Sequence, residues 1–315
     1  MYFLNYLDKE ADMINAVHRR GFLKAAGVAV AGPWILDLVA GGRPENKQSA
    51  SHPRLFSGCC AYSYAKYLKS GQMTMEDFIL KAVELGIDGV DITTYWLKST
   101  DPGYIVSLRH FAFKQGVPIS GIAIRSSMCQ PDPAKRAAEV AAVKKWVDVA
   151  EWLGASHIRV FGGKLPTGAS EEQSIQWVVE TMKPTCDYAA AKGITLGIED
   201  DGGMTDTAGM ASRILEILHR VDSPYAGINL DIANFTENEY KQIEACVPYA
   251  TAVHIRDVFG ETKGPIDLDR VWGIFAQGGY KGYMSAEYEG EEDPMTGVPK
   301  LVEKIKDLCK KYSTV

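Results

Sequence analysis

The sequence predicts an α/β fold, a (β/α)8 TIM barrel, preceded by an N-terminal extension. From residue 54 onward, short apolar runs rich in β-branched residues alternate with longer segments of helical period, and eight such units can be counted. A single barrel of about 250 residues fits the 315-residue chain once the extension is set aside. A doubly wound open sheet is the second choice, because no glycine-rich nucleotide fingerprint follows an early strand.

The extension, residues 1–53, is predicted to be a twin-arginine-type signal and linker, and residues 54–315 the catalytic domain. Arg19 and Arg20 precede a weakly hydrophobic stretch at 25–40 and a polar, proline-containing segment at 41–53. That order resembles the signals with which bacteria export folded proteins, so we expect a periplasmic protein. The alternatives are an amphipathic helix capping the barrel and a cytoplasmic location. Pro33 and Asp37 interrupt the apolar stretch, so no stable membrane anchor is expected.

The eight strands are predicted in chain order, each with a helical pattern before the next. They span residues 55–63, 89–95, 119–125, 157–162, 195–200, 226–234, 252–257 and 283–288. The clearest helical patterns span residues 75–85, 133–153, 171–192 and 207–220. Thr74 and Ser170 stand before acidic residues as helix N-caps do. Gly86, Gly154 and Gly193 stand where helices stop, in keeping with a left-handed C-terminal residue.

Composition excludes some classes of partner and of fold. The formal net charge is −6, and no concentrated basic face is visible, so nucleic acid is not expected to bind. The six cysteines form no C-x-x-C pair and fall mostly in predicted strands or helices, so we expect buried thiols rather than a disulfide framework. The sequence leaves the oligomeric state open, and a homo-oligomer is compatible with it.

The last four predicted strands each carry one chemically active residue near their carboxyl end. These are Glu199, Asp231, His254 and Glu287, spaced by 32, 23 and 33 residues. A strand-plus-helix unit takes about 30 residues, so the four side chains would meet at one end of the barrel. Three carboxylates and an imidazole suit a hard or borderline divalent ion that holds sugar oxygens. The sequence therefore predicts a metal site with these four ligands.

The same strand ends carry a family resemblance. Leu-Gly-Ile-Glu at 196–199, Asn-Leu-Asp-Ile-Ala-Asn at 229–234, Val-His-Ile-Arg-Asp at 253–257 and Ser-Ala-Glu-Tyr-Glu at 285–289 resemble the metal-site strand ends of the xylose isomerase-like sugar isomerase and epimerase superfamily. The resemblance spans residues 55–312. It implies one divalent ion, manganese, magnesium, cobalt or similar, bound by Glu199, Asp231, His254 and Glu287. It also implies that Glu199 and Glu287 lie on opposite faces of the substrate and exchange protons with it.

Metal chemistry of this kind leaves several outcomes open. A hydroxy-ketone whose carbonyl is polarised by the ion loses its adjacent proton to a carboxylate and forms an enediolate. Reprotonation gives an epimer or an isomer, and loss of a β-leaving group makes the enzyme a lyase. We therefore expect a sugar isomerase or epimerase. The alternatives are a lyase, dehydratase or hydrolase acting on 3-keto-glycosides, and a non-catalytic sugar-binding barrel. An endonuclease IV-like activity needs a histidine-rich three-metal cluster, and two of the six histidines precede the barrel.

Four further residues are expected to bind the substrate, a small carbohydrate: Arg159, Asn234, Arg256 and Asp257. Arg256 and Asp257 are also candidates for fixing the His254 tautomer. Tyr62, Tyr95 and Trp96 end early strands, where rings either wall a sugar pocket or join the core. Many relatives place a histidine two residues after the first metal glutamate, whereas this chain has Asp201 there. The additional acid disfavours anionic substrates, so a neutral sugar or sugar derivative is expected.

Overall fold

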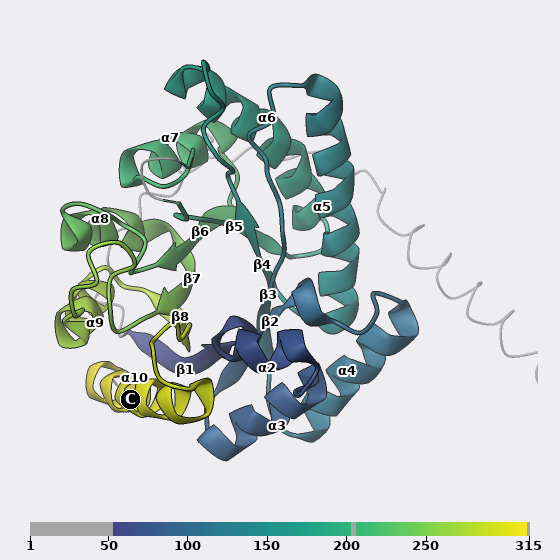
Figure 1. Ribbon diagram of the computed structural model, residues 1–315. Coiled ribbons are helices and arrows are strands. Elements are labelled where there is room, and N and C mark those ends of the chain that lie inside the picture. Colours follow the sequence, from purple (N-terminus) through teal and green to yellow (C-terminus); the bar gives the residue numbers. More distant parts are fainter. Residues whose placement is uncertain (1–52, 203–205, 314–315) are drawn as a thin grey trace, which may run out of the picture. The chain divides into compact units, whose positions relative to one another are not determined.

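The computed structural model describes residues 53–202 and 206–313, which form a closed barrel of eight parallel strands (Figure 1). The strands follow chain order around the barrel, and β8 pairs with β1 to close it. They are β1 (Arg54–Cys60), β2 (Gly89–Thr93), β3 (Ile119–Ala123), β4 (His157–Phe161), β5 (Thr195–Glu199), β6 (Ala226–Asp231), β7 (Ala250–Ile255) and β8 (Lys281–Ala286). The predicted (β/α)8 fold is confirmed.

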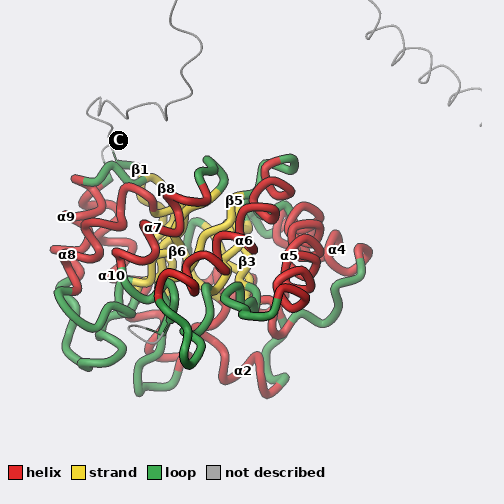
Figure 2. Tube along the Cα trace, turned by 90° about the horizontal axis from the view of Figure 1, so that it is seen from above, coloured by secondary structure: helices red, strands yellow, loops and turns green. Residues whose placement is uncertain are grey.

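Helices surround the strands on the outside (Figure 2). They are α2 (Ala65–Ser70), α3 (Met75–Leu85), α4 (Pro102–Lys114), α5 (Pro133–Leu153), α6 (Glu171–Ala190), α7 (Ala211–Val221), α8 (Glu239–Cys246), α9 (Leu268–Gln277) and α10 (Pro294–Tyr312). The longer loops gather at the end of the barrel where α2 lies. Because α2 follows β1, this is the end at which the strands finish, the face on which TIM-barrel enzymes carry their active sites.

The helix boundaries follow the predicted caps closely. Thr74 accepts a hydrogen bond from the backbone of Asp77 at 3.1 Å in a capping box, and Ser170 heads α6 in the same way. Gly86 and Gly154 take the left-handed conformation that ends α3 and α5. Two predicted helices were too long, since α6 ends at Ala190, and α7 begins only at Ala211 after a turn.

The predicted strands ran too far at their carboxyl ends, and side-chain turns explain where they stop. Residues 226–234 were predicted as one strand, but β6 ends at Asp231. The Asp231 carboxylate accepts a hydrogen bond from the backbone of Ala233 at 2.9 Å, so it bends the chain out of the sheet. After β1, residues Ala61–Tyr64 form a 3-10 turn instead of continuing the strand. The apolar pattern of the sequence alone does not show where these turns end the strands.

The barrel interior is polar, whereas the apolar core lies between the strands and the helices. In β2, buried Val90 and Ile92 alternate with Asp91, which reaches across to His254 on β7. His157 on β4 is also buried, and a side chain at Gly197 on the neighbouring strand would collide with its ring. The small residue on β5 is therefore what makes room for an imidazole inside the barrel.

Two further expectations concern thiols and membranes. All six cysteines are free and buried, as predicted. Among the described residues, no helix has both the length and the apolar character needed to span a bilayer. The predicted export signal at 1–53 lies, apart from Pro53, outside the described residues, so the structure does not test whether it contains a membrane anchor.

Candidate active site

The four predicted metal ligands lie at the carboxyl ends of β5 to β8. Glu199 and Asp231 are the last residues of their strands, His254 is the last but one of β7, and Glu287 directly follows β8. Asp231 and His254 are paired in register across β6 and β7. Each of the four side chains is buried, with at most 8% of the residue exposed. Neighbouring strands that end at one level thus place all four at one end of the barrel.

Three of the four form a compact group around one nitrogen of His254. Its Nδ1 atom lies 3.2 Å from Oε1 of Glu199 and 3.0 Å from Oε2 of Glu287. One ligand atom from each of these residues lies within 4.8 Å of the others, a spacing that could hold a metal ion. The amide of Asn229 donates to Glu199 Oε1 at 2.9 Å and lies 3.3 Å from Nδ1. Asn229 therefore helps to fix the carboxylate beside the ring.

Asp231 stands apart from this group because Arg256 binds it. Nε of Arg256 donates to Oδ1 of Asp231 at 3.2 Å, and Nη2 donates to Oδ2. The same guanidinium also donates to Asn234 Oδ1 and to the carboxylate of Glu289. Arg256 was expected to contact substrate hydroxyls, whereas here its donors are directed to protein side chains. Asp231 can join the other three ligands only if it shares or exchanges this partner.

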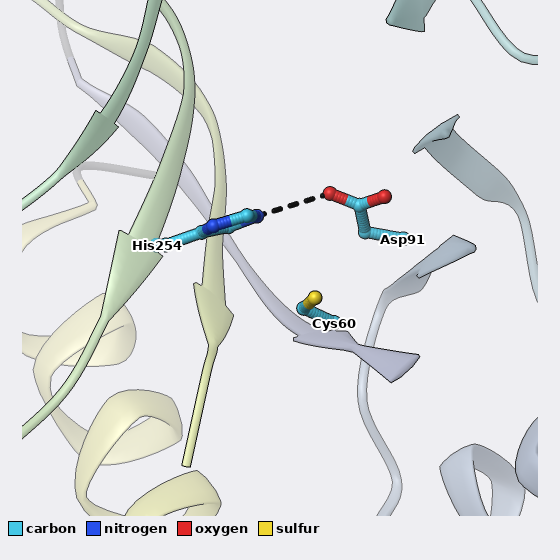
Figure 3. A group of neighbouring side chains, drawn as sticks. All are labelled: Cys60, Asp91 and His254. Atoms are coloured by element: carbon cyan, nitrogen blue, oxygen red, sulfur yellow. Dashed lines mark hydrogen bonds and ion pairs between the residues drawn. The ribbon is translucent and has the colours of Figure 1, made fainter. Parts of the chain in front are cut away.

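The other face of His254 binds an aspartate that the sequence analysis did not identify. Nε2 of His254 lies 3.1 Å from Oδ2 of Asp91, and Cys60 lies beside this pair (Figure 3). A carboxylate on one ring nitrogen leaves the other nitrogen free to bind a metal. The expectation that Arg256 or Asp257 fixes the tautomer was therefore wrong. The available signal was a single acid within the otherwise uncharged strand β2.

Electrostatics tie the ring and the carboxylates together. Burial lowers the pKa of His254, but the charge of Glu287 and the hydrogen bond to Asp91 outweigh burial and raise the pKa well above its usual value. Burial raises the pKa of Glu287, yet the charge of His254 holds it below the usual value. For Asp231 burial prevails over the neighbouring Arg256, and its pKa is raised. Negative groups thus crowd one ring, and a divalent cation bound at Nδ1 would take the place of the proton that otherwise balances their charge.

A cavity of about 210 Å³ opens beside these residues. It is lined by Tyr62, Tyr95, Arg159, Phe161, Glu199, Asp201, Asp231, Asn234, Arg256, Glu287 and Glu289. His254 is fully buried and is not part of the lining. Asp257 lines a separate cavity of about 510 Å³, where its carboxylate lies 3.4 Å from Nζ of Lys304. The structure therefore does not bring Asp257 together with the other predicted site residues.

Arg159 carries unused hydrogen-bond donors beside the cavity. Only 3% of this residue is exposed, its Nη2 donates to the hydroxyl of Tyr95 at 3.0 Å, and its Nη1 lies 3.3 Å from Oε2 of Glu199. Neither Nε nor Nη1 has a hydrogen-bond acceptor among the described residues. A buried guanidinium with free donors is costly unless something accepts from it. Both atoms are enclosed by protein, so the ion pair with Glu199 and the hydrogen bond to Tyr95 are the contacts that compensate this buried charge.

Aromatic rings form one wall of the cavity. Tyr62, Tyr95 and Phe161 line it, and the Arg159 guanidinium lies over the Phe161 ring at 3.9 Å. Trp96 does not line the cavity but packs behind the two tyrosines, with ring centroids 5.8 and 5.7 Å away. Two of the three rings predicted as candidates for a sugar wall thus occupy that place.

Comparison with known proteins assigns the chain to a family. The sequence model of the family described as "Xylose isomerase-like TIM barrel" matches residues 79–308. The chain belongs to this family. The resemblance inferred from the strand ends is confirmed at the family level. No curated protein matches the chain.

Solved structures share the barrel at low sequence identity. D-psicose 3-epimerase from Clostridium cellulolyticum H10 is 18% identical, with a TM-score of 0.67 over 82% of this chain and 100% of that one. D-allulose 3-epimerase from Methylomonas sp. is 24% identical, with a TM-score of 0.60 over 83% and 96%. The 3-keto-D-glucoside 4-epimerase YcjR from E. coli is 14% identical, with a TM-score of 0.63 over 81% and 99%. These similarities show the fold.

Proposed function

We propose that the protein is a divalent-metal-dependent sugar isomerase or epimerase that acts on a neutral sugar or sugar derivative. The observation that carries the proposal is the grouping of Glu199, His254 and Glu287 beside a cavity at the strand ends of the barrel. Small-molecule pockets are about 300–1,000 Å³ for drug-sized ligands. A cavity of about 210 Å³ therefore suits a ligand the size of a single sugar ring.

The donor set fits the proposed ion. Glu199, His254 and Glu287 would hold it, and Asp231 would be the fourth ligand. Oxygen donors with one imidazole suit Mn²⁺, Mg²⁺ or Co²⁺ rather than a thiophilic ion. When bound, such an ion polarises a substrate carbonyl and acidifies the neighbouring C–H bond.

The side chains of the chain itself would do the remaining work. Glu199 and Glu287 come from β5 and from the end of β8, so they approach the cavity from different sides of the barrel and can remove and return a proton. Arg159 lines the cavity, so its guanidinium would bind a substrate oxygen there. Tyr62 and Tyr95 would pack on the sugar and exclude water from it.

Charge favours a neutral substrate. Five carboxylates line the cavity, from Glu199, Asp201, Asp231, Glu287 and Glu289, against the two guanidiniums of Arg159 and Arg256. One of those guanidiniums is already bound to Asp231 and Glu289. Even with the proposed divalent ion bound, the negative charges exceed the positive ones by one, so a phosphate or carboxylate on the substrate would meet weak net repulsion. The Methylomonas and Clostridium relatives were crystallised with D-allulose and D-tagatose, which are uncharged sugars.

The second candidate function is a lyase or hydrolase acting on 3-keto-glycosides, and the surplus carboxylates favour it. Asp201 and Glu289 line the cavity but lie outside the metal-ligand group. Desolvation raises the pKa of both, although each keeps part of its surface exposed. A carboxyl group with a raised pKa can protonate a departing glycosidic oxygen, a step that epimerisation does not need. One relative of similar fold is a 3-keto-D-glucoside 4-epimerase.

The test is turnover in heavy water. The protein loaded with Mn²⁺ would be incubated with neutral ketoses and with 3-keto-glycosides, and the recovered sugars analysed by mass spectrometry. A product that has gained solvent deuterium but otherwise has the mass of the substrate indicates isomerisation or epimerisation. Release of the aglycone indicates the second candidate function. Glu287→Gln should abolish deuterium uptake, whereas Glu244→Gln, at an exposed position of α8, should not change it. Deuterium uptake by the Glu287→Gln variant would contradict the assigned acid-base pair. Sugar binding without turnover would support the non-catalytic barrel instead.

We also propose that the protein is exported through the twin-arginine route, on the basis of Arg19, Arg20 and the apolar stretch at 25–40. Cell fractionation checks this. The Arg19→Lys/Arg20→Lys double variant should remain in the cytoplasm while the unmodified protein reaches the periplasm. Equal distribution of the two would count against export.

A further inference from the structure

A second group of metal-binding side chains lies behind the first. Cys60 on β1, Asp91 on β2 and His254 on β7 each offer one donor atom, and these atoms lie within 4.8 Å of one another (Figure 3). All three residues are buried, with at most 3% exposed. Asp91 contacts His254 at Nε2, whereas the site described above uses Nδ1.

The chemistry of this second group differs from that of the first. It contains a sulfur, an imidazole nitrogen and a single carboxylate oxygen, a donor set that selects zinc or cadmium over magnesium or manganese. Thr93 supplies a hydroxyl 3.5 Å from the Cys60 sulfur, so a fourth donor is within reach. Oδ1 of Asp91 is buried without a hydrogen-bond partner among the described residues, which leaves that carboxylate with capacity to bind.

The second group is one side chain away from the cavity. The Cys60 sulfur lies 3.9 Å from Oε1 of Glu287, and Glu287 lines the cavity. Glu287 therefore stands between the cavity and the sulfur.

We propose that Cys60, Asp91 and His254 form an inhibitory site for a thiophilic divalent cation, Zn²⁺ or its probe Cd²⁺. A neutral imidazole has one lone pair for a metal, on either Nδ1 or Nε2. Binding at Nε2 leaves one ring proton on Nδ1, while the other ring proton and the thiol proton leave to solvent as the nitrogen and the sulfur bind. Nδ1 then cannot ligate the ion beside Glu199 and Glu287. This exclusion rests on the proposed function, but the binding of the thiophilic ion does not.

The first experiment tests binding alone, by titrating the full chain with Cd²⁺ and following the ultraviolet thiolate-to-cadmium charge-transfer band. The wild type should gain the band, and Cys60→Ser should not. Cys59→Ser is the matched control, because Cys59 is the preceding residue of the same strand, is equally buried and lies outside the donor group. The proposal is overturned if Cys60→Ser keeps the band or if Cys59→Ser loses it. Should Cys60→Ser fail to fold, Asp91→Asn serves instead, since it keeps the thiol and should weaken Cd²⁺ binding.

The second experiment tests the exclusion with the Mn²⁺ electron paramagnetic resonance signal. Cd²⁺ should release bound Mn²⁺ from the wild type and from Cys59→Ser, and Cys60→Ser should need a Cd²⁺ concentration higher by about tenfold or more. Equal release from the two cysteine variants would refute the exclusion. If no Mn²⁺ binds at all, the proposed function fails, and the charge-transfer band still decides whether the thiol site exists.

Discussion

At the scale of single residues, His254 is where the proposed chemistry converges. Its two ring nitrogens face different partners, Glu199 and Glu287 on one side and Asp91 on the other. An imidazole that donates from Nε2 to a carboxylate is oriented and electron-rich at Nδ1. Asp91 would therefore act as a positioning residue for the nitrogen that is proposed to bind the metal.

Asp91→Asn should lower the affinity for Mn²⁺ by about 10- to 100-fold. The asparagine amide can donate to Nε2, which would drive the ring proton onto Nδ1, the atom that is to bind the ion. Isothermal titration with Mn²⁺ measures the change. Asp187→Asn, at an exposed position of α6, is the control and should bind as the wild type does. An unchanged affinity in Asp91→Asn would show that the aspartate does not position the ring.

The sequence could identify only part of this arrangement. The sequence could identify the four candidate metal ligands, Glu199, Asp231, His254 and Glu287. Each lies at or next to the end of a strand, and all strands of a parallel barrel end on one face. The sequence could not identify Asp91 and Cys60, because their contacts run across the interior from β1 and β2 and depend on the register of the closed sheet. The pairing of Asp231 with Arg256 depends on the directions of two side chains at the ends of β6 and β7, which periodicity does not encode.

At the scale of elements, the ends of β6 and β7 are joined by the ion pair between Asp231 and Arg256. The aspartate also closes the turn after β6 through the backbone of Ala233. Capping residues made the starts of α3 and α6 predictable. The ion pair between the two strand ends could not be predicted in this way, because its residues are far apart in the sequence. It holds the proposed fourth metal ligand at the last position of β6, where the strand gives way to a turn.

Arg256→Gln should destabilise the protein by about 3–5 kcal/mol, because it leaves the Asp231 carboxylate buried without its partner. Mn²⁺ should then raise the melting temperature more in the variant than in the wild type, since the ion would neutralise the freed carboxylate. Thermal denaturation with and without Mn²⁺ measures both effects. Arg220→Gln is the control, because its ion pairs with Glu172 and Glu216 lie at the solvent-accessible surface and their loss should cost far less. Equal Mn²⁺ effects in Arg256→Gln and wild type would argue that Asp231 is not a ligand.

At the scale of the whole molecule, closure of the barrel brings together residues that are remote in the chain. Asp91 and His254 are 163 residues apart and meet inside the barrel. The interior consequently holds ionisable groups where a barrel of this kind usually packs branched apolar side chains. Protonation of such groups makes the folding stability of the whole barrel depend on pH.

His157 makes this dependence measurable. Burial lowers its pKa from 6.5 to about 4, so the folded protein keeps the ring neutral where the unfolded chain already binds a proton. The unfolded state binds more protons between these two values, so stability is complete above pH 6.5 and is lost as the pH falls through about 4. This residue alone should contribute about 3 kcal/mol to that loss. Urea unfolding of His157→Gln at pH 7 and pH 4.5 should show a smaller loss than the wild type. His110→Gln, exposed on α4, should show the wild-type loss, and an equal loss in all three proteins would mean that His157 is protonated in the folded barrel.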